Sequence, residues 1–309
     1  MTSPLLRLPP ELLDTIINHA STEDLKSLTL TNHLINEIAT KKLCSYWHYE
    51  IAARPSYPDL PTRHYHHMQH LYLNGNDGAR CDCLPPFAEA HWIERFPNLK
   101  VLDMVGTYDT TYTREERYVE KAAAVLRKMS LATPLEGRIV RGLQCLNLNI
   151  WGQWEPEEWF LGEIGVVFCI DSLRELSISG VHLLPDDPKI DNPEKYHGQT
   201  QLEMLDVSGL CIDTQALCNM LSFPKALLHV RIYQVNDEGY EDMPGECATM
   251  EGLTAALDKQ KHSLEVLEIQ RPLKIIGSPP IEECTLDLSG FPKLEEYIGP
   301  YRDSSGISK

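Results

Sequence analysis

One apolar pattern recurs along most of the chain and constrains its fold more than any other feature. It is a template of six positions in which positions 1, 4 and 6 are apolar, with two residues between the first pair and one between the second. The steps between copies are irregular, and range from 25 residues (Leu202 to Leu227) to 44 residues (Leu99 to Leu143). A degenerate further copy follows at Leu294. The seven legible copies are Met68, Leu71, Leu73; Leu99, Leu102, Met104; Leu143, Leu146, Leu148; Leu173, Leu176, Ile178; Leu202, Leu205, Val207; Leu227, Val230, Ile232; and Leu264, Leu267, Ile269.

The spacing within a copy is that of a short β-strand whose fourth and sixth residues point into a core. A return segment must then bring the chain back beside itself, so that neighbouring strands pair in parallel. Apolar residues recur at helical spacing in four of the returns, which we expect to be helices. These returns are Glu115–Met129, Glu157–Ile170, Asp213–Leu221 and Thr249–His262.

This arrangement resembles an irregular leucine-rich repeat, whose usual period is roughly 20 to 29 residues. The resemblance implies an α/β solenoid with a parallel sheet over residues 67–309. The asparagine expected at the ninth position of each repeat occurs only as Asn76, in the first copy. The alternative is an ordinary α/β sheet with buried strands, but seven copies of one template favour the solenoid.

Position 5 of the template should face outward, because side chains alternate across a strand. A row of polar and aromatic side chains on the concave face of a rigid scaffold is a predicted binding surface for a protein substrate. Three carboxylates against one arginine favour a basic segment as the ligand. The alternative is that these residues are merely solvated. The predicted row is Tyr72, Asp103, Asn147, Ser177, Asp206, Arg231 and Glu268.

Two other stretches could bind a partner. Trp151, Trp154 and Trp159 lie close together in WGQWEPEEW, and large aromatics in loops often anchor partners. We include Trp154 among the predicted substrate contacts, although each tryptophan could instead cover the repeat core. The segment from Ile232 to Asp258 contains carboxylates but no Lys or Arg, which is typical of a solvated loop.

The N-terminal region predicts three short amphipathic helices. Leu12 and Ile16 open a helical pattern after Pro9, whose fixed φ suits a first turn. Ser21 has the form of an N-cap for a second helix. A third helical pattern ends near Leu43 and is expected to continue through the aromatic residues Tyr46, Trp47 and Tyr49 to Ile51. Prolines at 55, 58 and 61 then mark a linker, at residues 51–66.

The opening LPPELL resembles the F-box, whose first helix begins with an LPxE element, here Leu8 to Glu11. The resemblance covers roughly residues 4–46, and we assign residues 1–50 to this helical domain. It implies that the helices bind the Skp-type adaptor, and through it a cullin, in a ubiquitin ligase whose substrate is selected by the rest of the chain. A tryptophan common in the third helix of the family is absent from Leu34 to Glu37. The alternative is a helical cap that binds no adaptor. The predicted adaptor contacts are Leu8, Pro9, Leu12, Ile16, Leu25, Leu28 and Leu30.

Charge and cysteine content restrict the kinds of partner and the cellular compartment that we expect. The chain has 28 Lys and Arg against 45 Asp and Glu, a formal charge of -17, which argues against nucleic acid or an anionic membrane as a partner. Nine scattered cysteines without a CxxC pair suggest reduced thiols. With no signal pattern and no long apolar run, we expect a cytoplasmic or nuclear protein.

The remaining alternative to a protein-binding function is a zinc site or an enzyme that uses a cluster of histidines and cysteines. His64, His66, His67 and His70 precede a CxC at Cys81 and Cys83, but structural zinc sites use CxxC knuckles, and a CxC in an extended strand points two ways. No P-loop, HExxH, GxSxG or dinucleotide-binding motif occurs. We therefore expect no cofactor, no metal and no catalytic residue.

Overall fold

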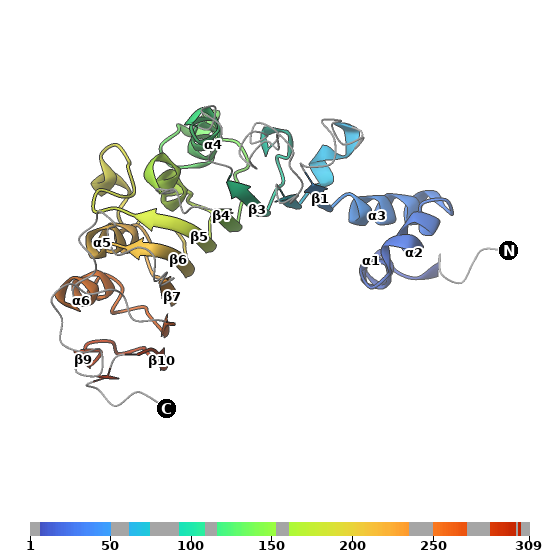
Figure 1. The fold of residues 1–309 in the computed structure, drawn as a ribbon. Coiled ribbons are helices and arrows are strands. Elements are labelled where there is room, and N and C mark those ends of the chain that lie inside the picture. Colours follow the sequence, from blue (N-terminus) through green and yellow to red (C-terminus); the bar gives the residue numbers. More distant parts are fainter. Residues whose placement is uncertain are drawn as a thin grey trace.

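The computed structural model describes residues 7–50, 62–74, 93–108, 116–152, 161–234, 250–270, 285–300 and 302–303, and every structural statement below concerns these residues. The chain forms a small group of N-terminal helices followed by an arc (Figure 1). Strands line the inner side of the arc, and α4, α5 and α6 lie on its outer side (Figure 1). No described helix combines the length and the apolar character that crossing a membrane requires.

The inner side of the arc is one sheet of nine strands, all paired in parallel and ordered as in the sequence. Two further strands, β9 (Thr285–Leu286) and β11 (Arg302–Asp303), form a separate parallel pair. The predicted α/β solenoid with a parallel sheet is confirmed. The nine strands are β1 (Tyr46–Glu50), β2 (His70–Asn74), β3 (Val101–Tyr108), β4 (Cys145–Gly152), β5 (Glu175–Leu183), β6 (Met204–Ile212), β7 (His229–Gln234), β8 (Val266–Ile269) and β10 (Glu296–Ile298).

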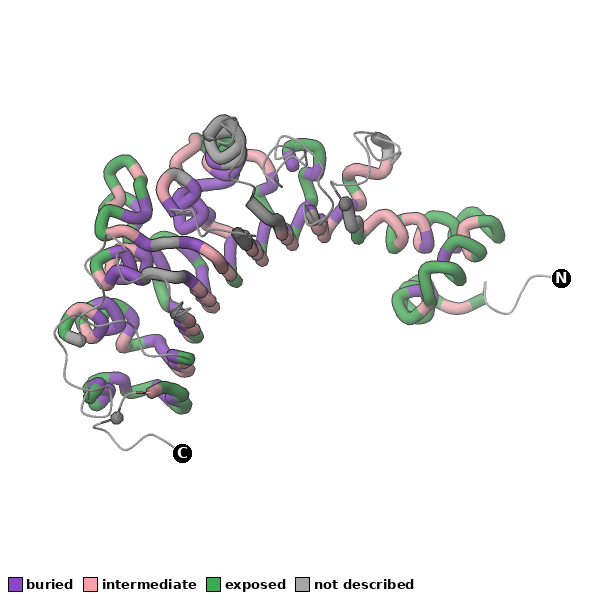
Figure 2. The backbone as a smooth tube through the Cα atoms, in the orientation of Figure 1, coloured by how far each residue is buried: buried purple, intermediate pink, exposed green. Residues whose placement is uncertain are grey.

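The repeated apolar residues form a continuous core behind the sheet. All three apolar positions of each of the seven copies are at most 2% exposed. The degenerate copy is less well covered, with Leu294 at 8% and Tyr297 at 7%. Buried residues thus run along the whole arc between its strands and its outer segments (Figure 2). Burial of this stacked core is the main stabilising contribution, since no single repeat can cover its own apolar side.

Successive repeats are joined by a ladder of backbone carbonyls just before the strands. The carbonyl of each position-2 residue accepts two N–H groups from the next repeat; Gln144, for example, accepts from Arg174 at 2.8 Å and from Glu175 at 2.9 Å. The same double acceptance fixes where every strand begins relative to its neighbours. The accepting residues are Ser45, Gln69, Lys100, Gln144, Arg174, Glu203, Leu228 and Glu265.

Three of the four predicted return helices are confirmed. They are α4 (Glu116–Met129), α5 (Thr214–Ser222) and α6 (Met250–Asp258). The fourth prediction, over Glu157–Ile170, was wrong in type, because the described part is a 3-10 helix, η5 (Gly162–Cys169). Its apolar residues are buried all around, and Gly165 lies so close to Pro188 that a Cβ there would be 2.1 Å from the proline Cβ. Further short 3-10 segments include η2 (Thr62–His67), η4 (Leu135–Gly137) and η6 (Pro193–Tyr196).

The N-terminal helices form their own core, separate from that of the solenoid. They are α1 (Pro10–Asn18), α2 (Thr22–Leu28) and α3 (His33–Leu43), as predicted from the pattern. Ser21 caps α2 by accepting the Asp24 N–H at 3.2 Å, and Asn32 caps α3 by accepting the Leu34 N–H at 2.9 Å. Their buried core is Ile17, Leu25, Ile35 and Ala39.

The predicted continuation of the third helix beyond Leu43 was wrong. The chain leaves the helix at Cys44, and Tyr46–Glu50 form strand β1, which pairs in parallel with β2. The register places Trp47 opposite Leu71 and Tyr49 opposite Leu73. These aromatics therefore fill positions 4 and 6 of an additional template copy, and aromatic residues favour strands. The sheet begins at Tyr46, before the predicted boundary at residue 50, while residues 51–61 of the predicted linker lie outside the described part.

A buried glutamine after α6 ties the end of that helix to the segment between α5 and β7. Gln260 is 4% exposed, and its side-chain oxygen accepts the Leu227 N–H at 2.9 Å. Its amide nitrogen donates to the carbonyls of Leu221 at 2.7 Å and Pro224 at 3.0 Å. One side chain thus satisfies three backbone groups that have no access to water.

We expect Gln260→Leu to lower the free energy of unfolding by about 2 to 4 kcal/mol, because it leaves buried backbone groups unpaired at nearly constant volume. Chemical denaturation of both proteins measures the difference. Gln144→Leu is the matched control, since Gln144 is exposed and its side chain makes no hydrogen bond with another described residue. Equal destabilisation by the two changes would contradict the role of Gln260.

Candidate functional site

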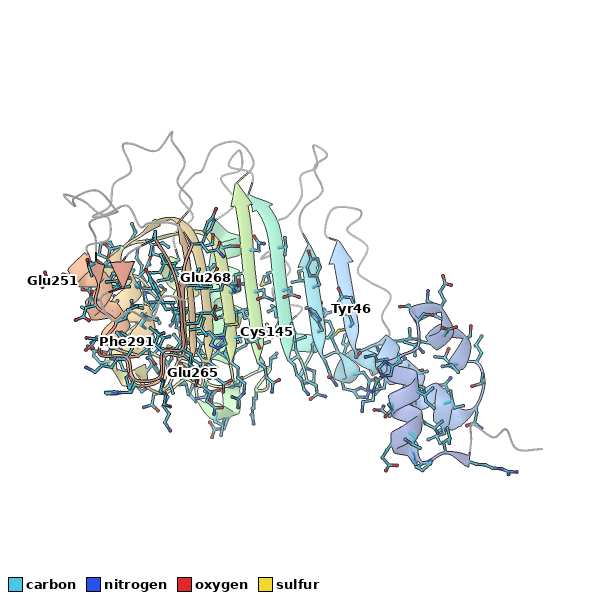
Figure 3. All side chains as sticks on the ribbon, turned by 90° about the horizontal axis from the view of Figure 1, so that it is seen from below. Tyr46, Cys145, Glu251, Glu265, Glu268 and Phe291 are labelled. Atoms are coloured by element: carbon cyan, nitrogen blue, oxygen red, sulfur yellow. The ribbon has the colours of Figure 1, made fainter. Side chains whose placement is uncertain are left out.

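The register of the sheet brings the position-5 residues into one line across its inner face. Tyr72 lies opposite Asp103, Asp103 opposite Asn147, and so on through Arg231 and Glu268. All seven are partly exposed. Figure 3 views this face, with Tyr46, Cys145 and Glu268 marking its course from β1 to β8. We call these seven residues, from Tyr72 to Glu268, the concave row.

The first half of the concave row is connected by a chain of polar contacts centred on Asp103. Its carboxylate accepts the Asn147 side-chain amide and also contacts the His70 imidazole. The ring of Tyr46 meets that imidazole edge-on, with ring centroids 4.7 Å apart. Asp103 is therefore not a free carboxylate, because neighbouring strands on both sides supply partners for its two oxygens.

The second half is an ion-pair group built on three adjacent strands. Arg231 donates from Nε to Glu268 Oε2 at 2.6 Å and from Nη1 to Asp206 Oδ2 at 3.1 Å. These hydrogen bonds, first that to Glu268, raise the pKa of Arg231. The pKa of Glu268 is lowered, first by the hydrogen bond from Gln270, which donates at 2.6 Å, and then by that from Arg231. Asp206, Arg231 and Glu268 thus carry one net negative charge.

Neutral polar residues separate these two halves. Ser177 lies between Asn147 and Asp206 in the row. Two residues further along the strands, at position 7, the Ser179 hydroxyl donates to the Asn149 side-chain oxygen at 2.8 Å. At positions 5 and 7, β4 and β5 therefore offer hydrogen-bonding groups without charge.

The inner face as a whole has an acidic balance. Among the described side chains at positions 3, 5 and 7 of the repeats, one guanidinium, that of Arg231, accompanies five carboxylates. The carboxylates are those of Asp103, Glu175, Asp206, Glu268 and Glu296. The face is therefore more acidic than the row alone, in which Arg231 accompanies three carboxylates.

Cys145 was not singled out from the sequence, yet it lies on the same face beside the row. Burial raises its pKa to about 11, with further contributions from the charges of Glu175 and Asp103. A thiol in this environment stays protonated at neutral pH and is a poor nucleophile. Only the strand pairing reveals this setting, since Asp103 and Glu175 belong to different repeats.

The predicted adaptor contacts divide into two sets. Leu12, Ile16 and Leu30 are 50%, 46% and 87% exposed, so they are available to a partner. Leu25 was assigned wrongly, because it is 5% exposed and part of the core of the three helices, against which Leu28 also packs.

Three further apolar residues lie just before α1 and in α3. Leu8 is half-buried, and Pro9 is exposed as the N-cap of α1. Leu34, in the first turn of α3, is 38% exposed. We call Leu12, Ile16, Leu30 and Leu34 the exposed apolar set.

Several predicted features lie outside the described residues, including Trp154, Trp159, Cys81, Cys83, Asn76 and most of the acidic segment after Ile232. In the histidine stretch, His66 and His67 have ring centroids 3.8 Å apart. Burial lowers the pKa of His67, and the charges of His66, His64 and Lys41 lower it further. No group of three or more His, Cys, Asp or Glu suited to a metal ion occurs in the described parts of the chain.

Comparison with known proteins yields a structural likeness alone. No protein-family model matches the chain, and no curated protein does. A similar solved structure is the crystal structure of an internalin (inlF) from Listeria monocytogenes strain 4b F2365, which has 12% sequence identity and a TM-score of 0.38 over 100% of this chain and 97% of that chain. The parallel, in-register sheet described above defines the fold independently of this likeness.

Cys145 yields a prediction about reactivity. With its pKa raised to about 11, the thiolate fraction at pH 8 falls to about one in a thousand, so we expect alkylation roughly a hundredfold slower than that of a free cysteine. The rate should rise about tenfold for each pH unit up to about pH 10 and level off above the pKa of about 11. Iodoacetamide labelling with mass spectrometry of the Cys145 peptide measures it, and the same reaction in urea is the control. Equal rates in native and unfolded protein would contradict the assigned environment.

Proposed function

We propose that this chain is the substrate-recognition subunit of an SCF-type ubiquitin ligase. Helices α1 to α3 bind a Skp-type adaptor, which connects the chain to a cullin, and the concave row binds the protein to be modified. The chain catalyses nothing itself. Its solenoid supplies a rigid binding surface, which is what a repeat scaffold of this kind offers to a protein partner.

The observation that carries the proposal is the exposed apolar set. The three helices complete a core of their own, yet Leu12, Ile16 and Leu30 remain largely in solvent. Several large apolar side chains exposed on so small a helical unit are typical of a surface that a partner covers. They lie within the stretch that carries the F-box resemblance, and the LPPELL opening leads into α1, which begins at Pro10.

The concave row supports the second half of the proposal. Its side chains are held by neighbouring strands and by one another, so little conformational entropy is lost when a ligand binds. The acidic balance of the face favours a basic protein segment, attracted by charge and bound less tightly as salt increases. The polar centre around Ser177 can hydrogen-bond to the backbone of such a segment.

The first test concerns the adaptor. We expect Leu12→Asp with Ile16→Asp to abolish adaptor binding, because each side chain contributes about 1.5 to 3 kcal/mol when a contact buries it fully, and a carboxylate there must also be desolvated. Pull-down and calorimetry with the purified Skp-type adaptor measure it. The matched control is Thr15→Asp with Asn18→Asp, which places two carboxylates at other exposed positions of α1.

Because both altered side chains are exposed, the helices should remain folded, which circular dichroism checks. Undiminished binding by the Leu12 and Ile16 double variant, or no binding by the unaltered protein, contradicts the ligase role. In the second case, retained binding of a basic peptide leaves a leucine-rich-repeat scaffold as the function.

The second test concerns the concave row. Changing Asp103, Asp206 and Glu268 to their amides should weaken binding of an octalysine peptide by about tenfold or more and flatten its salt dependence, since three negative charges are lost. The matched control changes Glu203, Glu265 and Glu295, at position 2 of the repeats, to glutamine, with the same loss of charge. Fluorescence anisotropy at low and moderate ionic strength measures both.

A third variant addresses the rival site. If Trp154→Ala removes peptide binding while the triple amide variant binds as the unaltered protein does, the tryptophan segment is the binding site and the concave row is not. Equal weakening by the triple amide variant and by its control would show that only the overall charge matters.

A further inference from the structure

Arg231 pairs with both carboxylates in the acidic half of the concave row. It is the one cation among the described side chains of the inner face, and it lies between two carboxylates from the strands on either side. We infer that in the free protein Arg231 occupies the place that a cationic side chain of a bound segment takes between Asp206 and Glu268, and so acts as a built-in competitor. This inference rests on the proposed binding of a basic segment by the concave row.

The contacts show which member of the group can move. The Glu268 side chain is 16% exposed and is also held by Gln270, and the Asp206 side chain is 25% exposed. The Arg231 side chain is 42% exposed. A long side chain with its charged end partly in water can turn outward and keep its hydration, whereas Glu268 cannot leave its position without losing a hydrogen bond in a mostly buried setting.

A ligand cation cannot share this place with Arg231, because two like charges within a few ångströms repel each other. The cation of the ligand must therefore form ion pairs and hydrogen bonds with the two carboxylates that are at least as favourable as those of Arg231. A guanidinium that donates to both at once meets this condition better than a compact ammonium. Arg231 thus lowers the affinity for any basic segment and favours segments that present arginine at this point.

The test uses the full chain and two probes, an octalysine and an octaarginine peptide. We expect Arg231→Met to bind octalysine about three- to tenfold more tightly, because the competing charge is removed and the group gains one net negative charge. The preference for octaarginine over octalysine should become smaller. Arg231→Lys keeps the charge without the fork of donors and should lie between the two.

The matched control is Arg174→Met. Arg174 is a partly exposed arginine paired with Glu203, so this variant also removes one positive charge and one ion pair, but outside the concave row. It should bind octalysine about as the unaltered protein does. Circular dichroism checks that each variant is folded, and Arg231→Gln, which can still donate to one carboxylate, replaces Arg231→Met if the latter is not.

The outcomes separate this inference from the proposal on which it rests. One outcome is that the unaltered protein binds octalysine while the Arg231 variants bind it equally or more weakly. Arg231 then forms a structural ion pair or contacts the ligand directly, and the inference is wrong while the proposed surface stands. If neither the unaltered protein nor the variants bind octalysine, both are wrong. A gain by Arg174→Met equal to that of Arg231→Met overturns the inference in favour of overall charge.

Discussion

The double acceptance of N–H groups by one carbonyl in each repeat is the constraint on which the rest of the structure depends. From Ser45 to Glu265, each position-2 carbonyl binds two consecutive amides of the following repeat. This makes every strand begin at the same level, whatever the length of the return segment that precedes it. The irregular steps between repeats are therefore absorbed on the outer side, and the inner face keeps one register in which Tyr72 to Glu268 form a line.

Most of the fold could be predicted from the sequence, because its determinants are local. The apolar positions of a copy such as Leu202, Leu205 and Val207 reveal their inward direction by spacing alone, and α5 follows from a helical period. Strand β1 was missed because Cys44, Trp47 and Tyr49 fill its template positions, and aromatic residues after a helix also fit a longer helix. The backbone pairing with β2, which decides the matter, is not a local property.

The surfaces were harder to predict, for two physical reasons. The row followed from strand alternation, but its internal pairing did not, since the partners of Arg231 are 25 and 37 residues away. In α1, Leu12 and Leu13 are followed four residues later by Ile16 and Ile17, so both pairs satisfy a helical period. Only the packing of α2 and α3 decides that Leu13 and Ile17 face inward. Leu25 was misassigned for the same reason.

The connection between α3 and β1 has a geometrical consequence for anything bound at the two ends of the molecule. Only Cys44 and Ser45 separate them, and the Ser45 carbonyl is itself the first member of the ladder, accepting from Gln69 and His70 at 2.9 Å each. The helices therefore project from the end of the solenoid on a connection of two residues, without a flexible linker (Figure 1). This short connection restricts the orientation of the helices relative to the sheet. The distance between a partner on α1 and another on the concave row would then change mainly when the arc itself bends.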